Sequence, residues 1–260
     1  MPNLLIDKRQ KLKWFKYTSE LEFSFERMAK DLKYDDILVE ESEERLNMLK
    51  KVNTFYKFFY SKIKEELKNE LSAEDVLSIV GNTELEISIH TFTFRYLIRD
   101  WGLNKKYDQR QKIVSFLSKK LNDLNVFPAD TALFLGCGSG RYPVDLAHYY
   151  KKIDAFDSSL PMIWSILNLK KIKKWRVLHK IEKNCRKISD TYQDEELVIT
   201  DEQIRIIDEK INFFVGDLNS IELHSSSVNH IYSIYFTDVF PLKLLLTKID
   251  FLLKNYGLFV

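Results

Sequence analysis

The stretch LFLGCGSGRYPVDLA, at residues 133–147, places three of the chain's seven glycines within five residues. Gly136, Gly138 and Gly140 directly follow a short apolar run that reads as a strand, and a predicted helix follows them. Glycine allows the backbone to turn tightly and allows another molecule to approach it closely. A strand, a glycine-rich turn and a helix in this order are typical of a nucleotide-cofactor site at the carboxyl end of a strand.

The spacing of the glycines distinguishes between cofactor classes. A dinucleotide site would read G-x-G-x-x-G, but its third glycine position is occupied here by Arg141. The tighter G-x-G-x-G form suits S-adenosyl-L-methionine better than a pyrophosphate, and no G-K-[ST] follows to make a P-loop. Such a turn also occurs as a plain link between strand and helix. Cys137, inside the turn, is interpreted as a small residue beside the cofactor and not as a nucleophile.

Carboxylates end the next predicted strands. Asp157 ends IDAFD, about 20 residues after the loop begins, where a carboxylate can bond both ribose hydroxyls or can cap the following helix. Asp217 ends FVGD and can accept from the adenine amino group or from turn amides, with Leu218 next to it as a further cofactor contact. The loop and both carboxylates lie at strand carboxyl ends, so we predict one cofactor site at that edge of the sheet.

The two halves of the chain differ in pattern. Apolar residues at helical spacing predict helices over residues 40–71 and 107–125, and Ser72 and Gly81 are the predicted start and stop of a short helix between them. Residues 84–102 fit either a strand or a buried helix. After residue 125, strands and helices alternate, which predicts a parallel sheet. The predicted fold class is α/β, with an all-helical region at residues 1–125 and a Rossmann-like domain of about five parallel strands at residues 126–260.

Composition excludes several classes of protein. The net charge of +2 gives no reason to expect nucleic acid or an acidic membrane as a partner, and no apolar segment is long enough to span a bilayer. Two cysteines make no disulfide framework, the N-terminus has no secretion signal, and the cytoplasm is the expected location. The five histidines lack ligand spacing, so no metal is predicted. The basic residues 170–187 and the acidic residues 190–209 are expected to neutralise each other, the alternative being an RNA-binding patch.

Five segments give the sequence a family resemblance. In order along the chain they are YLIRDWG, GCGSGR, AFDSS, FVGDLNSI and YFTDVF. Together they resemble the carnosine N-methyltransferase-like family of S-adenosyl-L-methionine-dependent enzymes over residues 92–260. The resemblance implies a class I methyltransferase domain preceded by helices. It also implies methylation of an imidazole nitrogen in a histidine-containing dipeptide, and it favours a helix for the segment ending in RDWG.

The resemblance also implies roles for individual residues. Arg99 corresponds to the arginine that binds the cofactor's carboxylate, and Tyr96 stands where the family usually has a cofactor-binding glutamine. The remaining implied contacts with the cofactor come from the loop with Arg141, from the ribose and adenine acids Asp157 and Asp217, and from Leu218. Asp238, in YFTDVF, corresponds to the catalytic acid.

The chemistry of methyl transfer gives Asp238 a definite task. An imidazole nucleophile must present a neutral nitrogen, and its unperturbed pKa near 6.5 leaves most of it neutral at pH 7. A carboxylate that accepts a hydrogen bond from the opposite ring N–H selects the tautomer and stabilises the positive charge that develops. Asp238 can also simply cap the helix that Pro241 begins. After Asp238 the family's A-H-N segment is replaced by Phe240, Pro241 and Leu242.

Three functions compete at this point. The first is small-molecule imidazole methylation, the second is methylation of RNA or protein, and the third is a non-catalytic methyltransferase-fold subunit. The sequence ends at NYGLFV, within the fifth predicted strand and before the aromatic segment that the family uses for its substrate. We therefore expect the C-terminal strands to be missing and a partner chain or a second copy to complete the sheet.

Overall fold

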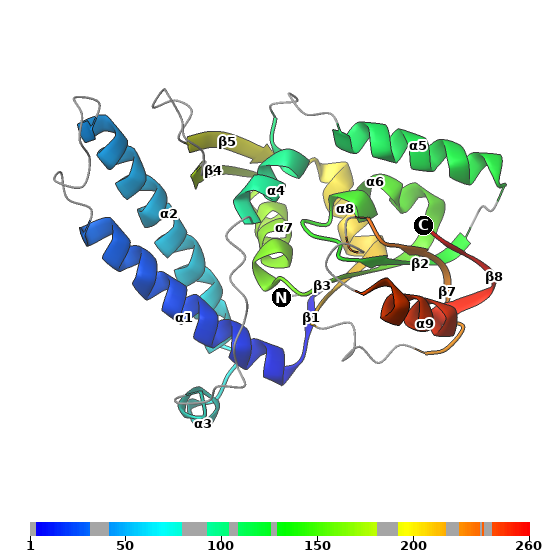
Figure 1. The fold of residues 1–260 in the computed structure, drawn as a ribbon, viewed down its shortest axis with the longest axis horizontal. Coiled ribbons are helices and arrows are strands. Elements are labelled where there is room, and N and C mark those ends of the chain that lie inside the picture. The colour runs from blue at the N-terminus through cyan, green and yellow to red at the C-terminus, as the bar shows by residue number, and fades with distance from the viewer. Residues whose placement is uncertain are drawn as a thin grey trace. The chain divides into compact units, whose positions relative to one another are not determined.

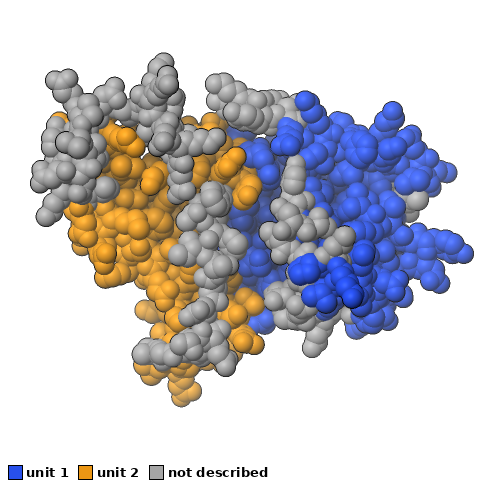
Figure 2. All heavy atoms as spheres, in the orientation of Figure 1, with its two compact units in different colours: residues 1–7, 99–174, 198–260 blue, residues 8–98, 175–197 orange. Residues whose placement is uncertain are grey.

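The computed structural model describes residues 4–31, 42–79, 93–103, 109–125, 129–180, 192–216, 224–234, 236 and 241–260 (Figure 1). The chain forms two compact units, coloured separately in Figure 2. The sheet unit comprises residues 1–7, 99–174 and 198–260, and the helical unit comprises residues 8–98 and 175–197. This division reflects compactness, so the predicted domain boundary after residue 125 stays a prediction.

The sheet unit is built on a six-stranded parallel sheet in the order β1-β6-β3-β2-β7-β8. The strands are β1 (Leu4–Ile6), β2 (Ala129–Leu135), β3 (Tyr150–Asp157), β6 (Ile211–Val215), β7 (Val228–Tyr232) and β8 (Leu253–Phe259). The helices of this unit are α5 (Gln109–Asp123), α6 (Arg141–Leu146), α7 (Leu160–Ile172), α8 (Asp201–Lys210) and α9 (Leu242–Leu252). The predicted α/β, Rossmann-like fold and its five parallel strands are confirmed.

The N-terminal segment β1 is a strand that the sequence did not predict, and β4 (Lys174–Lys180) and β5 (Tyr192–Val198), outside this sheet, were not predicted either. Leu4, Leu5 and Ile6 pair in parallel with residues 213–215 of β6 and extend the sheet by one strand. Three residues are too few to show the period-two alternation by which a strand is recognised. A helical region does follow β1, as predicted, but the first residues of the chain belong to the sheet.

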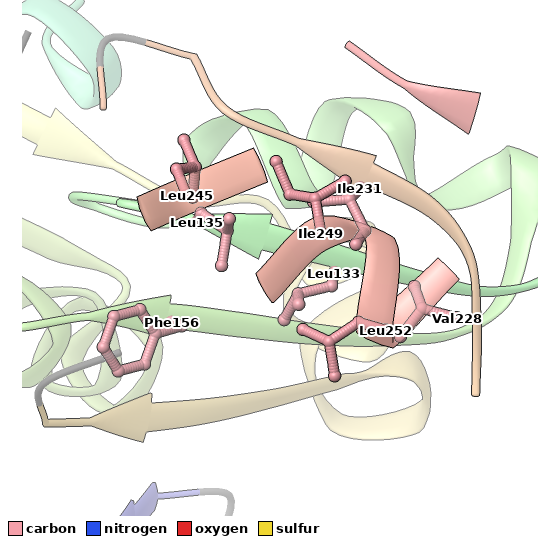
Figure 3. Close-up of a cluster of buried hydrophobic side chains, with 8 residues drawn as sticks. All are labelled: Leu133, Leu135, Phe156, Val228, Ile231, Leu245, Ile249 and Leu252. Carbon is pink, nitrogen blue, oxygen red and sulfur yellow. The ribbon is translucent and has the colours of Figure 1, made fainter. Parts of the chain in front are cut away.

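One face of the sheet is covered by α9 (Figure 3). Leu245, Ile249 and Leu252, spaced along one side of α9, pack against Leu133 and Leu135 of β2. Phe156, Val228 and Ile231 complete this cluster of buried residues. Complete burial of one such side chain is worth about 1.5–3 kcal/mol, so the cluster fixes β2 beneath α9.

The helical unit contains α1 (Lys8–Asp31), α2 (Ser42–Lys68), α3 (Ala73–Leu77) and the two-stranded sheet of β4 (Lys174–Lys180) and β5 (Tyr192–Val198). Its centre is aromatic: Phe59 lies 4.7 Å from Phe94 and 5.9 Å from Trp175 between ring centroids. Ser72 caps α3 through a capping box with Asp75, as predicted. The predicted stop at Gly81 lies outside the described residues.

The remaining helix predictions are also confirmed in part. Residues 42–68 and 109–123 are helical. The ambiguous segment forms α4 (Thr93–Trp101), as the resemblance indicated, while residues 80–92 lie outside the described part of the chain. Phe58 of α2 belongs to the apolar residues at helical spacing but does not face the interior, because 58% of it is exposed.

The described residues of the basic and acidic segments form ion pairs with each other, in line with the prediction. Arg176 of β4 binds Asp194 of β5 through two hydrogen bonds of 2.6 and 2.7 Å. In the sheet unit, Lys173 binds Asp201 at 2.6 Å. His179 points into the helical unit, where its Nδ1 lies 3.1 Å from the hydroxyl of Tyr56. The ion pairs offset charges, and the burial of His179 removes a ring, that the RNA alternative would use.

The face of the sheet opposite α9 holds a buried polar group of three residues. The Tyr150 hydroxyl lies 2.8 Å from Nδ1 of His230 and also bonds the hydroxyl of Tyr232. Burial lowers the pKa of His230 below its ordinary value of 6.5 and raises the pKa of Tyr232 to about 12. All three side chains are therefore neutral in the folded chain at pH 7.

The lowered pKa of His230 predicts a specific loss of stability in acid. As the pH falls through 6.5, the unfolded chain takes up a proton on this residue before the folded chain does, so the folded state loses stability. Between pH 7 and pH 5, the free energy of unfolding should fall more in the wild type than in His230→Gln, by up to about 2 kcal/mol. Urea unfolding at both pH values checks this. Equal pH dependence in the two proteins would contradict the role of His230.

Candidate cofactor-binding site

The glycine-rich loop leaves the sheet where the strand order reverses. From β2 the chain continues to β3 and then β6 on one side, and afterwards it returns to β7 and β8 on the other side of β2. Open parallel sheets bind ligands at such a switch point, outside the carboxyl ends of the strands. The loop at residues 136–140 follows the carboxyl end of β2 directly.

All three glycines adopt the left-handed conformation, with φ of 62° at Gly136, 56° at Gly138 and 72° at Gly140. The Cys137 N–H donates to the carbonyl of Phe156 at 2.8 Å, and the Gly140 N–H donates to the carbonyl of Cys137 at 3.0 Å. Residues other than glycine rarely adopt the left-handed backbone conformation. The glycines are therefore required by the shape of the turn itself.

Aromatic rings lie against two of the three glycines. A Cβ at Gly136 would lie 2.6 Å from Cδ2 of Phe236, and one at Gly140 would lie 2.8 Å from Cε1 of Phe213. At Gly138 the nearest described atom would be Cε of Met162, at an ordinary 3.6 Å. Among the described residues, packing therefore restricts Gly136 and Gly140 but not Gly138.

Asp157 joins the end of β3 to this loop. Its Oδ2 accepts from the Gly138 N–H at 2.7 Å, and its Oδ1 accepts from the Ser159 N–H at 2.8 Å, before α7. The carboxylate thus binds amides on both sides, and Ser159 is the residue at the N-cap position of α7. A carboxylate has about four acceptor sites, so these bonds are compatible with ribose hydroxyls at the same group. The ribose contact stays a prediction.

The last residues of α4, at positions 99–101, hold the loop from another direction. The Ser139 hydroxyl donates to Oδ2 of Asp100 at 2.6 Å, and the Trp101 indole N–H donates to the Ser139 carbonyl at 3.1 Å. Arg99 donates to the same Asp100 carboxylate from Nε at 2.7 Å. The roles of Asp100, Trp101 and Ser139 were not predicted from the sequence, although the RDW segment and the residue between the last two glycines were the available signal.

Arg141 contacts neighbouring protein groups. Its Nε donates to Oδ1 of Asp145 at 3.0 Å, and its guanidinium carbon lies 4.6 Å from the centroid of the Trp101 ring. Arg110 of α5 also binds Asp145. Burial lowers the pKa of Arg141, which the Asp145 carboxylate opposes. Arg141 therefore fixes the start of α6, and its predicted cofactor contact stays a prediction.

The remaining candidates have different outcomes. Burial, followed by the charge of Asp157, raises the pKa of the Cys137 thiol well above its ordinary value, so the thiol is protonated and is a poor nucleophile. Tyr96 belongs to the helical unit and is 44% exposed. The other three candidates, Asp217, Leu218 and Asp238, lie outside the described residues.

The described residues offer neither a metal site nor a membrane span. Within them, no group of three or more His, Cys, Asp or Glu side chains is placed to hold a metal ion. In the same part of the chain, each helix is too short or too polar to cross a membrane.

Comparison with known proteins gives matches among solved structures alone. No protein-family model and no curated protein matches the chain, so the resemblance to the carnosine N-methyltransferase-like family gains no support from them. The chain is similar to a protein from Methanococcus maripaludis described as an S-adenosyl-L-methionine-dependent methyltransferase. The identity is 15% and the TM-score 0.45, with 66% of this chain and 64% of that chain covered.

Two further solved structures are similar at the same level. One is described as a methyltransferase in complex with the Haloferax volcanii activator Trm112. The identity is 19% and the TM-score 0.38, and the match covers 66% of this chain and 58% of that chain. The other is geranyl diphosphate C-methyltransferase from Streptomyces coelicolor. The identity is 13% and the TM-score 0.35, and the match covers 65% of this chain and 64% of that chain. The chain spans less than two thirds of the length of each structure. With TM-scores below 0.5, these likenesses assign no function, which must be argued from the chain's own site.

The different surroundings of the glycines lead to a prediction for stability. Gly140→Ala should lower the free energy of unfolding by about 2–4 kcal/mol, because it combines left-handed strain with a clash against Phe213. Gly138→Ala, the matched control, adds only the strain and should cost about 1–2 kcal/mol. Chemical denaturation of both variants measures the difference. Equal costs would show that Phe213 does not restrict position 140.

Proposed function

We propose that the chain is an S-adenosyl-L-methionine-dependent methyltransferase whose cofactor lies at the carboxyl ends of β2 and β3. One observation carries the proposal. At the switch point of the sheet, the left-handed turn with three glycines is hydrogen-bonded to the Asp157 carboxylate through the Gly138 N–H. A nucleoside cofactor needs close approach to backbone and a carboxylate for its ribose. The spacing G-x-G-x-G suits this cofactor better than a dinucleotide.

Each residue then has a stated task. Gly136, Gly138 and the Cys137 backbone would lie against the cofactor's amino-acid end, Asp157 would accept from the ribose hydroxyls, and Arg99 would bind the cofactor's carboxylate. Asp217 and Leu218 would contact the adenine, and Tyr96 would lie at the glutamine position of the resembling family. When bound, the cofactor supplies a methyl group on a sulfonium, which is a good leaving group. Much of the catalysis can then come from positioning, a contribution that reaches about 7–11 kcal/mol in ideal cases.

The narrower proposal is that the acceptor is an imidazole nitrogen of a histidine-containing small molecule, as the resemblance implies. Asp238 would accept a hydrogen bond from the opposite ring N–H and stabilise the developing positive charge. RNA or protein acceptors and a non-catalytic role in a complex are the alternatives. The ion pair of Arg176 with Asp194 and the inward position of His179 disfavour RNA. A location in the cytoplasm belongs to the same proposal.

A partner chain also belongs to the proposal. β8 is an edge strand of the sheet and pairs with β7 alone within the described residues. Tyr256 on β8 and Leu244 and Phe251 on α9, the helix that precedes β8, are large exposed side chains. An exposed edge with apolar neighbours is suited to pairing with another chain. Light scattering, and methyltransferase assays with and without a candidate partner, test this part.

The activity is tested by transfer of a labelled methyl group. Purified chain with labelled S-adenosyl-L-methionine should label carnosine or a related histidine peptide in preference to RNA or bulk protein. Transfer to RNA alone would replace the imidazole proposal with the nucleic-acid alternative. Cofactor binding without transfer to any acceptor would favour the non-catalytic subunit.

Asp157 supports the first functional prediction. Asp157→Asn keeps the shape of the side chain but loses the charge and one acceptor, so affinity for S-adenosylhomocysteine should fall at least about tenfold. Asp157→Ala should lose detectable binding and also loosen the loop, because it removes the bond to Gly138. Asp130→Asn, at the amino end of β2, is the matched control and should bind like the wild type. Calorimetry measures affinity, and unchanged affinity in Asp157→Ala would contradict the ribose assignment.

Asp238 supports the second functional prediction. Asp238→Asn should lower the turnover of an imidazole acceptor by about 100-fold, since it removes the charge that stabilises the developing imidazolium. The affinity for S-adenosylhomocysteine should change by less than about twofold, because the change lies on the acceptor side. Steady-state rates and calorimetry separate the two quantities. Unchanged turnover would reduce Asp238 to a helix cap.

A further inference from the structure

Asp100 is a buried acid that binds the loop. Its side chain is only 3% exposed. Oδ1 accepts from Nε of Arg99 at 2.7 Å, while Oδ2 accepts from Nη2 of Arg99 at 3.1 Å and from the Ser139 hydroxyl at 2.6 Å. A buried carboxylate is stable only when charged and polar groups bind it in this way. One side chain therefore joins Arg99 on α4 to the glycine-rich loop.

The pairing of Arg99 with Asp100 is unusual for a helix. Side chains at adjacent positions point in different directions, so they do not normally face each other. Here two donors of the guanidinium reach two oxygens of the next residue, which fixes the plane of the Arg99 fork. The guanidinium carries five donors, so a pair through Nε and Nη2 is compatible with binding of a second carboxylate.

Trp101 strengthens the same connection. Its indole N–H donates to the Ser139 carbonyl at 3.1 Å, so consecutive residues hold Ser139 by its hydroxyl and by its carbonyl. The Arg141 guanidinium covers the Trp101 ring at 4.6 Å, where a cation over an aromatic face is stabilised. Ser139 is itself fully buried. The loop and the end of α4 therefore form one hydrogen-bonded body.

We propose that Asp100 is a positioning residue. It holds the Arg99 guanidinium in a fixed orientation relative to the glycine-rich loop, so that Arg99 can bind the amino-acid end of the cofactor. The inference rests on the proposed function, in which Arg99 binds the cofactor's carboxylate. Asp100 itself does not touch the cofactor. It acts on the ligand's amino-acid end through Arg99. The ribose would be bound by Asp157, whose bond to the Gly138 N–H does not involve Asp100.

Two ligands distinguish this role from general support of the fold. S-adenosylhomocysteine carries the amino acid and its carboxylate, whereas 5′-methylthioadenosine carries the nucleoside and sulfur without them. Asp100→Asn should weaken S-adenosylhomocysteine about tenfold or more, because it removes the charge that orients the guanidinium. Affinity for 5′-methylthioadenosine should stay within about twofold. Loosening of the whole loop would weaken both ligands alike.

The experiment is calorimetric titration of wild type, Asp100→Asn, Arg99→Gln and the double variant with both ligands. If Asp100 acts through Arg99, adding Asp100→Asn to Arg99→Gln should lower S-adenosylhomocysteine affinity by less than about twofold further. Asp130→Asn is the matched control with unchanged affinities. Equal losses for both ligands in Asp100→Asn, no loss for either, or fully multiplicative losses in the double variant would overturn the positioning role.

A separate outcome concerns the proposed function. If the wild type binds neither ligand, the cofactor assignment fails before any variant is compared. If the wild type binds and Asp100→Asn does not fold, Ser139→Ala replaces it, because that variant removes one anchor of Asp100 without leaving a charge unpaired. Ser139→Ala should weaken S-adenosylhomocysteine about threefold and leave 5′-methylthioadenosine unchanged. Equal effects on the two ligands would overturn the proposal.

Discussion

The hydrogen bond between the Asp157 carboxylate and the Gly138 N–H is the interaction on which the candidate site depends. It joins the carboxyl ends of two adjacent parallel strands, and the same carboxylate binds the Ser159 amide before α7. The three left-handed glycines have no side chains with which to fix the shape of the turn. The charge at the end of β3 therefore supplies what the turn lacks, and it does so at the switch point of the sheet.

Packing and a second set of hydrogen bonds complete the restraint of the turn. The rings of Phe213 and Phe236 occupy the space that side chains at two of the glycines would need. Asp100 and Trp101 hold the remaining loop residue, Ser139, by both of its oxygens. Such prior fixation matters for binding, because ordering a loop during association would cost affinity. The loop can therefore act as a preformed surface for a ligand.

Much of this could be predicted from sequence, and the failures have physical causes. The glycine spacing and the alternation of strands and helices after residue 125 predicted the sheet, because both patterns are local. β1 was missed because three residues show no period. The contacts of Asp100 and Trp101 with Ser139 were missed because they join positions 38 or 39 residues apart, which no local pattern encodes. Asp157 was expected to bind a ribose or to cap a helix, and its bond to Gly138 was not foreseen.

The central claim is that this fixed turn binds the nucleoside and amino acid of S-adenosyl-L-methionine. Calorimetric titration of the wild-type chain with S-adenosylhomocysteine, with NAD as the competing dinucleotide, tests it most directly. The account predicts saturable binding of one S-adenosylhomocysteine per chain, with a Kd of about 100 μM or tighter, and no measurable heat from NAD. Absence of binding at millimolar S-adenosylhomocysteine, or preferential binding of NAD, would contradict it.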